Sequence, residues 1–398
     1  MDPVKIIHAA SQHGYVRIVE AQLRHGRCDV DAVMPGQRGE TPLFVACMNG
    51  HHDVAGLLIN YNANVDHITE HGTTALFAAV RSGNIDLSLM ILRRSVSVDD
   101  ANFAGLTPLI LATAKGYEVV VRALVEAGAS TSRHNIHGMT PVIAAASGGF
   151  VRIMNWLIRE HNAPINGIPG GVKAITKAAR RGHTHVIEVL VHEHGAMIEC
   201  GCPLRHAAGR GHLDTASSLI TLGAFVDSID GGETAICASA ANGYLEVTKL
   251  LVEKGATLAR VGSVAPLHAA ASKGRLQTVK WLLDACADVN EQSIDSTTAI
   301  YAAAAYTPNP FYWRVVLLLV TAGAVFDAAF IWSLEPRLRS TINRWANDTI
   351  ILEIYEPMHE IIATTLVNIP TEIVNLIVQF VAPSWFDVMC DHFMHMPL

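Results

Sequence analysis

Residues 107–116 read Thr-Pro-Leu-Ile-Leu-Ala-Thr-Ala-Lys-Gly. The pattern returns with its Gly nine residues after its Thr, at Thr41 with Gly50 and at Thr140 with Gly149. Counting weaker copies, the motif begins at positions 41, 74, 107, 140, 173, 202, 234, 265 and 298, and an opening copy covers residues 6–14. The first four steps between these positions are of 33 residues each. A fixed period of this length predicts a repeat architecture of about ten structural units.

Each copy carries the sequence signals of two short helices. The motif Pro suits a first helical turn, where its missing N–H leaves no hydrogen bond unmade, and the Thr before it is a natural N-cap. A second helix follows the Gly, as in residues 243–255, where apolar residues recur at helical spacing before Gly255 stops the helix. Pairs such as Ala207-Ala208 and Ala269-Ala270 allow helices to approach closely. One helix pair cannot bury its apolar face alone, so stacked neighbours must supply the core.

The period and the Thr-Pro-Leu-His pattern, with Thr-Pro-Leu at residues 107–109 and Pro-Leu-His at residues 266–268, resemble the ankyrin repeat over residues 1–328. The resemblance implies an all-α, ankyrin-repeat solenoid of about ten helix-turn-helix units, in which the turn before each motif projects as a finger. It also implies that the chain binds proteins, with its finger tips and with a concave groove at the ends of the first helices, and that it is not an enzyme. The sequence therefore predicts a protein-protein interaction adaptor.

The composition agrees with a folded, protein-binding chain. Half of the 398 residues are hydrophobic and 16% are charged, the opposite of a disordered composition. A net charge of −7 gives no reason to expect nucleic acid or an anionic membrane as partner. The seven scattered cysteines suggest no disulfide framework, and the apolar stretch at residues 315–320 is too short to span a bilayer. We expect a cytoplasmic location, in the protein's own cell or in a host cell, with the nucleus as a second possibility.

Two copies depart from the regular pattern. The finger before the seventh unit is shortened to residues 197–201, which predicts a notch or a bend there. In the tenth unit, the residues at 306–313 replace the inter-helix Gly and include Pro308 and Pro310, which predicts a longer loop. Either this loop marks the end of the array or it is a functional insertion.

Residues 329–398 leave the repeat and form a separate segment that we predict to be helical. Its amphipathic stretch around Pro370 resembles the opening of an F-box, with Ile369 in place of the usual Leu, and the C-terminal PRANC module of ankyrin proteins. Only 29 residues run from Pro370 to Leu398, fewer than a full F-box, and the Pro-Leu-Pro signature of a SOCS box is missing. The resemblance implies recruitment of a Skp-family adaptor and a cullin ubiquitin ligase through Ile369, Pro370, Glu372, Ile373, Leu376, Ile377 and Phe380. The alternative is a scaffold or masking protein in which this segment only caps the array.

Basic residues occupy the positions that the resemblance places in the groove. The two residues before each inter-helix Gly include no acidic residue in units two to nine, and they include Arg81, Lys115, Arg180, Arg181, Arg210 and Lys273. A basic stripe on an acidic protein favours a target with an acidic surface. The alternative is that these residues are solvated helix ends.

Two neighbouring fingers carry apolar residues. These are Phe103 and Leu106 in one finger, and Ile136 and Met139 in the next. Exposed apolar groups in adjacent fingers suggest an interaction site, and the alternative is packing between the fingers.

A cluster of potential zinc ligands lies between residues 183 and 212: His183, His185, His192, His194, Cys200, Cys202, His206 and His212. The cluster lacks a paired Cys-x-x-Cys, and His183 and His212 occupy the ordinary position after the inter-helix Gly. Nor does the sequence show a phosphate-binding loop or a convincing pairing of nucleophile and base. We therefore expect no metal and no cofactor, and we keep a metal-dependent or catalytic role as a remote alternative.

Overall fold

The computed structural model describes residues 2–34, 36, 38–166, 173–199, 201–305 and 310–325. Over these ranges the chain is all-α, without a β-strand, and its helices follow one another as ten pairs. The predicted stack of about ten helix pairs is therefore confirmed. Residues 329–398, with the F-box-like stretch, lie outside the described residues. None of the described helices is long and apolar enough to cross a membrane.

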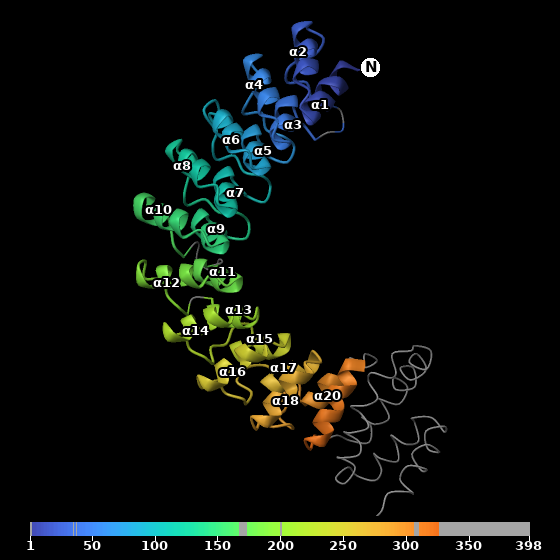
Figure 1. The fold of residues 1–398 in the computed structure, drawn as a ribbon, viewed down its shortest axis with the longest axis vertical. Helices are drawn as coiled ribbons and strands as arrows, with labels where there is room; N and C mark the ends of the chain where they lie inside the picture. The colour runs from blue at the N-terminus through green and yellow to red at the C-terminus, as the bar shows by residue number, and fades with distance from the viewer. Residues whose placement is uncertain are drawn as a thin grey trace, which may run out of the picture. The chain divides into compact units, whose positions relative to one another are not determined.

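The chain divides into two compact units, residues 1–203 with 217–224 and residues 204–216 with the residues from 225 onward. Figure 1 labels the helices in chain order. The first six pairs are α1 Pro3–His13 with α2 Val16–Arg24, α3 Pro42–Met48 with α4 His52–Asn60, α5 Ala75–Ser82 with α6 Ile85–Leu92, α7 Pro108–Lys115 with α8 Glu118–Glu126, α9 Pro141–Gly148 with α10 Val151–His161, and α11 Ala174–Arg181 with α12 Thr184–His192. The last four are α13 Pro203–Ala208 with α14 Leu213–Thr221, α15 Ala235–Asn242 with α16 Leu245–Glu253, α17 Pro266–Ser272 with α18 Leu276–Asp284, and α19 Ala299–Ala304 with α20 Pro310–Thr321.

Motif residues cap many of the first helices as predicted, although Lys173 before α11, Ala265 before α17 and Thr298 before α19 make no side-chain cap hydrogen bond. The Thr107 hydroxyl accepts a hydrogen bond from the Ile110 N–H across 3.2 Å, and the same cap recurs at Thr41, Thr74, Thr140 and Thr234. Gly116 ends α7 with φ 75°, in the left-handed region that favours glycine. A Cβ on Gly116 would also lie 2.5 Å from the Phe150 ring, so both the backbone and the neighbouring unit require glycine here.

In the first unit the helices form two rows (Figure 1). The first helices α1, α3, α5, α7, α9 and α11 each pack against the next, and second helices such as α4, α6 and α8 do the same beside them. Small residues in the first helices, such as Ala145 and Ala178, are fully buried, as are larger ones such as Leu109 and Ile143. Close helix approach through small residues thus builds the row whose ends carry the fingers.

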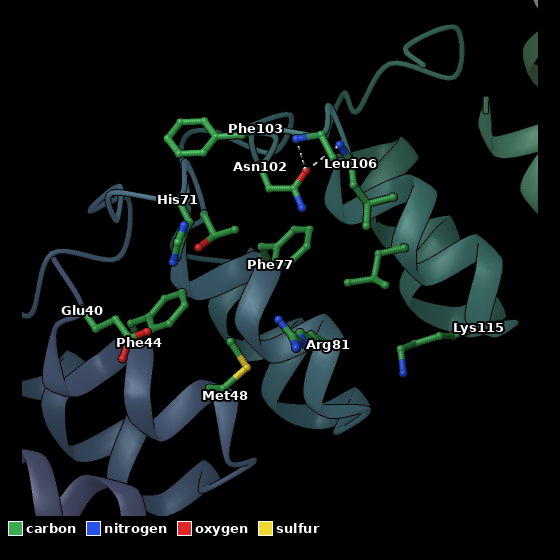
Figure 2. Close-up of a pocket in the computed structure, with 13 residues that line it drawn as sticks. Glu40, Phe44, Met48, His71, Phe77, Arg81, Asn102, Phe103, Leu106 and Lys115 are labelled. Atoms are coloured by element: carbon green, nitrogen blue, oxygen red, sulfur yellow. Dashed lines mark hydrogen bonds between the residues drawn. The ribbon is translucent and has the colours of Figure 1, made fainter. Parts of the chain in front are cut away.

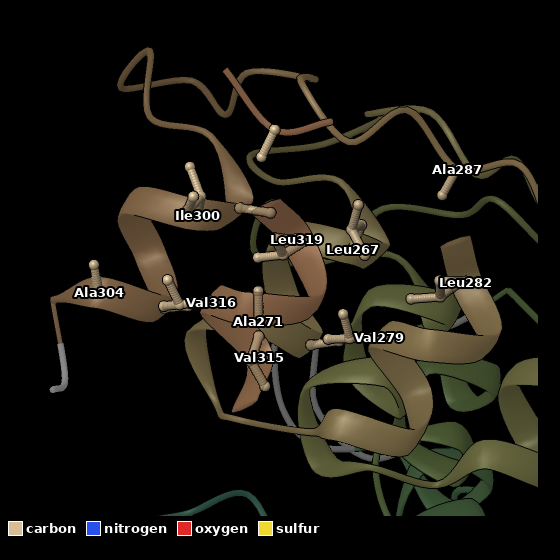
Figure 3. Packing of buried hydrophobic residues seen from close by; sticks show 14 of the residues in the cluster. Leu267, Ala271, Val279, Leu282, Ala287, Ile300, Ala304, Val315, Val316 and Leu319 are labelled. Atoms are coloured by element: carbon tan, nitrogen blue, oxygen red, sulfur yellow. The ribbon is translucent and has the colours of Figure 1, made fainter. Parts of the chain in front are cut away.

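In the second unit, the tenth helix pair packs against the ninth (Figure 3). Val315, Val316 and Leu319 of α20 pack into one buried cluster with residues of the ninth pair, including Leu267, Val279 and Leu282. Pro310 begins α20, where a Pro leaves no helix hydrogen bond unmade. Residues 305–309 join α19 to α20, whereas only residues 273–275 join α17 to α18. The longer loop predicted at residues 306–313 stays a prediction, because residues 306–309 lie outside the described residues and residues 310–313 belong to α20.

Backbone hydrogen bonds tie the fingers of the first unit to one another. The N–H of Glu70 donates to the Arg38 carbonyl across 2.9 Å, that of Phe103 to the His71 carbonyl across 3.3 Å, and that of Ile136 to the Ala104 carbonyl across 2.9 Å. In the second unit the Ile294 N–H donates to the Ser263 carbonyl in the same way, across 2.9 Å. Between α12 and α13 only residues 193–202 intervene, compared with residues 93–107 between α6 and α7, so the short finger is real. The notch or bend expected there stays a prediction.

Candidate functional site

A hollow of about 630 Å³ opens on the face formed by α3, α5, α7 and the fingers that precede them (Figure 2). Its apolar lining comes from one or two side chains of each helix, among them Phe44, Met48, Phe77 and Leu111. Phe44 and Phe77 follow their capping Thr by three residues, so the repeat itself puts them in the same register. Regular stacking of the units therefore brings together, at the base of the hollow, apolar side chains from helices that are far apart in the sequence.

Two of the predicted groove cations line this hollow. Arg81 and Lys115 lie in the last turns of α5 and α7, where positive charge is favourable, and both are exposed. Over the described part of the chain, neither has an acidic side chain within 4 Å, and Lys115 lies 5.8 Å from the centre of the Tyr117 ring. Glu40 also lines the hollow, at the end opposite Lys115 in Figure 2. An apolar hollow thus carries two cations, one from its middle helix and one from its last helix, that no ion pair neutralises within the described ranges.

The finger above the hollow is held by Asn102. Its side-chain oxygen accepts hydrogen bonds from the N–H groups of Ala104 and Leu106, each across 3.0 Å, as the dashed lines in Figure 2 show. This loop presents Phe103 with 77% of its surface exposed, its ring edge-on to His71 at 6.3 Å between centroids. The Arg38 guanidinium can only donate, so Nε2 of His71 accepts from it across 2.8 Å.

The four predicted finger residues do not share one environment. Phe103 and Ile136 project into solvent, with Ile136 70% exposed, whereas Leu106 and Met139 are half-buried. Phe103 and Leu106 both line the hollow that Arg81 and Lys115 also line, with Phe103 and Lys115 on opposite sides of it in Figure 2. The structure thus brings two of the predicted cations together with two of the predicted apolar finger residues.

The other predicted cations lie elsewhere. Arg180 and Arg181 are exposed in the last turn of α11, and they share that helix with Lys177, which the sequence analysis did not single out. Burial, and then the nearby charges of Arg180 and Arg181, lower the pKa of Lys177. Arg210 and Lys273 are exposed in the second unit. A basic stripe that runs from one unit to the other stays a prediction.

Sequence reasoning also missed a second, smaller hollow of about 390 Å³ between α1 and α3. Its polar side chains include Lys5 and Glu40, and Val45 and Met48 are among its apolar ones; the other polar side chains are His8, Gln12 and Asn49. Lys5 and Glu40 were overlooked because only the positions before each inter-helix Gly were considered. Glu40 directly precedes the capping residue Thr41. A search that included the residue before each capping Thr would have found it.

Two histidines among the potential zinc ligands of residues 183–212 are engaged in hydrogen bonds. Nε2 of His183 pairs with the Ser147 carbonyl of the preceding unit across 3.1 Å, and Nε2 of His194 pairs with the Asn155 side chain across 2.8 Å. Burial, and then the charge of Arg159, lower the pKa of His194. Within the described ranges, which leave out Cys200, no three His, Cys, Asp or Glu side chains are grouped to hold a metal ion.

Comparisons with known proteins agree with the repeat. The family model of ankyrin repeats (3 copies) matches residues 6–102, 89–169, 175–262 and 204–293. The crystal structure of the human ASB11 ankyrin repeat domain is 26% identical, covers 53% of this chain and 98% of that chain, and gives a TM-score of 0.47. No curated protein matches the chain. Since the family matches take in most of the sequence, this chain belongs to the ankyrin-repeat family.

Proposed function

We propose that this chain is a non-catalytic adaptor that binds an acidic protein target on the face formed by α3, α5, α7 and their fingers. Ankyrin repeats are generally protein-protein interaction modules, and this chain is built of them. The observation that carries the proposal is the pair of Arg81 and Lys115, which have no ion-pair partner among the described residues, beside an apolar hollow.

The two parts of this surface contribute differently to binding. Burial of an apolar side chain in the hollow supplies the main favourable free energy. The cations add attraction to acidic partners and disfavour basic ones, which raises association rates and selects the partner. An exposed aromatic residue beside the hollow, Phe103, fits the role of an interface anchor.

The second half of the proposal concerns residues 329–398. We propose that the F-box-like stretch with Ile369, Pro370 and Ile373 recruits a Skp-family adaptor and a cullin, and so hands the bound target to a ubiquitin ligase. The sequence pattern alone supports this step. The alternative is a scaffold or masking protein in which the same stretch covers the last apolar face of the array.

The target-binding half is tested by affinity capture with quantitative mass spectrometry. The full chain, an Arg81→Glu/Lys115→Glu variant and a Lys254→Glu/Lys280→Glu variant are compared. Lys254 and Lys280 are exposed and lie outside the hollow, so the control makes the same change in net charge. We expect acidic proteins that the full chain and the control capture and that the first variant loses. Equal capture by all three proteins would refute this half of the proposal.

The ligase half is tested by comparing the full chain with a version that ends at Asp327. We expect the Skp-family adaptor and the cullin to be recovered only with the full chain, and to be lost in Pro370→Ala/Ile373→Asp with circular dichroism unchanged. If neither version recovers them and the shortened version aggregates, the segment is a cap and the protein is a scaffold.

A further inference from the structure

The two hollows of the first unit adjoin each other. Glu40 and Met48 line both of them. Glu40 directly precedes the capping residue Thr41, and Met48 is the last residue of α3. The larger hollow continues from α3 to α7, and the smaller one from α3 back to α1. The two hollows therefore adjoin along four consecutive first helices, and they are called the trough below.

The length of the trough suits an extended peptide. Packed helices lie about 8–10 Å apart, so the three spacings from α1 to α7 span about 24–30 Å. An extended chain advances about 3.3 Å per residue, so about eight residues would cover this length. The volumes of about 630 and 390 Å³ leave room for large side chains at intervals along it.

Charged side chains along the trough place one acidic residue between basic ones. Lys5 lines the hollow at α1, Glu40 lies at the junction, and Arg81 and Lys115 line the part over α5 and α7. Within the ranges that the structure describes, none of these four side chains takes part in an ion pair. A partner with the complementary order of charges would therefore find all of them available.

We propose that the trough binds one extended protein segment of about eight residues in which acidic residues flank a basic one. A bulky apolar side chain occupies the larger hollow beside Phe103, and a neighbouring carboxylate pairs with Arg81 and Lys115. The basic residue pairs with Glu40, and a second carboxylate pairs with Lys5. This inference rests on the proposed function and names the chemistry of the target that the site takes.

The test begins with a displayed library of random octapeptides selected on the full chain. We expect enrichment of peptides with a large apolar residue, an acidic residue close to it and a basic residue further along. Fluorescence anisotropy of labelled, enriched peptides should then show at least tenfold weaker binding to Arg81→Glu/Lys115→Glu. Binding to Lys254→Glu/Lys280→Glu should be unchanged, and circular dichroism melting should show that both variants are folded.

A charge swap tests the register of the segment. Glu40→Lys should weaken the enriched peptides, and should regain binding of peptides whose basic residue is replaced by Glu. Enriched peptides that bind both charge variants equally, or no enrichment at all, would overturn the inference. If the library fails while acidic folded proteins are still captured in a manner that depends on Arg81 and Lys115, the proposed function stands and only the peptide inference falls. Loss of both kinds of binding would refute both.

Discussion

The side-chain oxygen of Asn102 accepts a hydrogen bond from the backbone N–H of Leu106 across 3.0 Å, and this bond closes the finger that carries Phe103. Asn135 does the same in the next finger, for the N–H groups of His137 and Met139 at 2.9 and 3.0 Å. The two fingers are therefore built alike, and only the one held by Asn102 lines the larger hollow. Substitutions of Asn102 and Asn135 can therefore distinguish an effect on stability from an effect on binding.

We expect Asn102→Ala and Asn135→Ala to lower the free energy of unfolding by similar amounts, about 1–2 kcal/mol, because each removes hydrogen bonds inside a finger. Urea unfolding followed by circular dichroism measures this. Only Asn102→Ala should also weaken binding at the hollow, because only that finger presents Phe103. Equal weakening by both variants would mean that the effect is general loosening of the fingers.

Phe103→Ala should leave stability almost unchanged, because the side chain is 77% exposed. Binding of a target at the hollow should weaken by about 30-fold, the loss of about 2 kcal/mol typical of an interface anchor. Anisotropy titrations with Ile136→Ala as the control measure this, since Ile136 is equally apolar and exposed but does not line the hollow. Unchanged affinity in Phe103→Ala would remove Phe103 from the binding surface.

A Thr→Val substitution should change the stability of the chain differently at Thr107 and at Thr298. Thr107→Val should destabilise the chain by about 1 kcal/mol, because the buried Thr107 hydroxyl accepts from the Ile110 N–H at the start of α7. Thr298→Val should be neutral or stabilising, because the Thr298 hydroxyl is buried with no hydrogen-bond partner among the described residues. Urea unfolding of both variants provides the comparison, and destabilisation by Thr298→Val would show that its hydroxyl does find a partner.

Stability should fall at high pH in a way that depends on Cys47. Burial raises the pKa of the Cys47 thiol above its ordinary value of 9.0. Above pH 9 the unfolded chain therefore loses this proton while the folded chain keeps it. The unfolded state then binds fewer protons, so stability decreases as pH rises. The contribution is fully present below pH 9 and is reduced by about 1.4 kcal/mol for each further pH unit.

The difference in unfolding free energy between the wild type and Cys47→Ala isolates this thiol, since other titrating groups cancel. We expect the difference to be constant from pH 7 to 8 and to shrink by about 1.4 kcal/mol by pH 10. A difference that does not change over this range would show that Cys47 ionises equally in both states.

Local interactions explain why so much of the fold was predictable. The Thr107 cap and the Gly116 stop act within a few residues of chain, and the 33-residue period repeats them, so helix pairs could be placed from sequence alone. The exposed ends of the first helices followed from the same register, which is why the exposure of Arg81 and Lys115 could be expected from the sequence, whereas their role in binding stays a prediction. The tenth pair was less clear, because its inter-helix Gly is replaced and its recognition as a pair depends on how Val315 and Leu319 pack.

The sequence by itself determined the repeat, many of the helix caps and the basic residues that precede five of the inter-helix Gly residues. Tertiary structure alone decided that Lys5, Glu40, Arg81 and Lys115 line two adjoining hollows, and that Phe103 and Leu106 line the same hollow as two of these cations. The physical reason is that these contacts join units dozens of residues apart. They form only when first helices stack through small buried residues and the fingers bond to one another, as Phe103 does to His71.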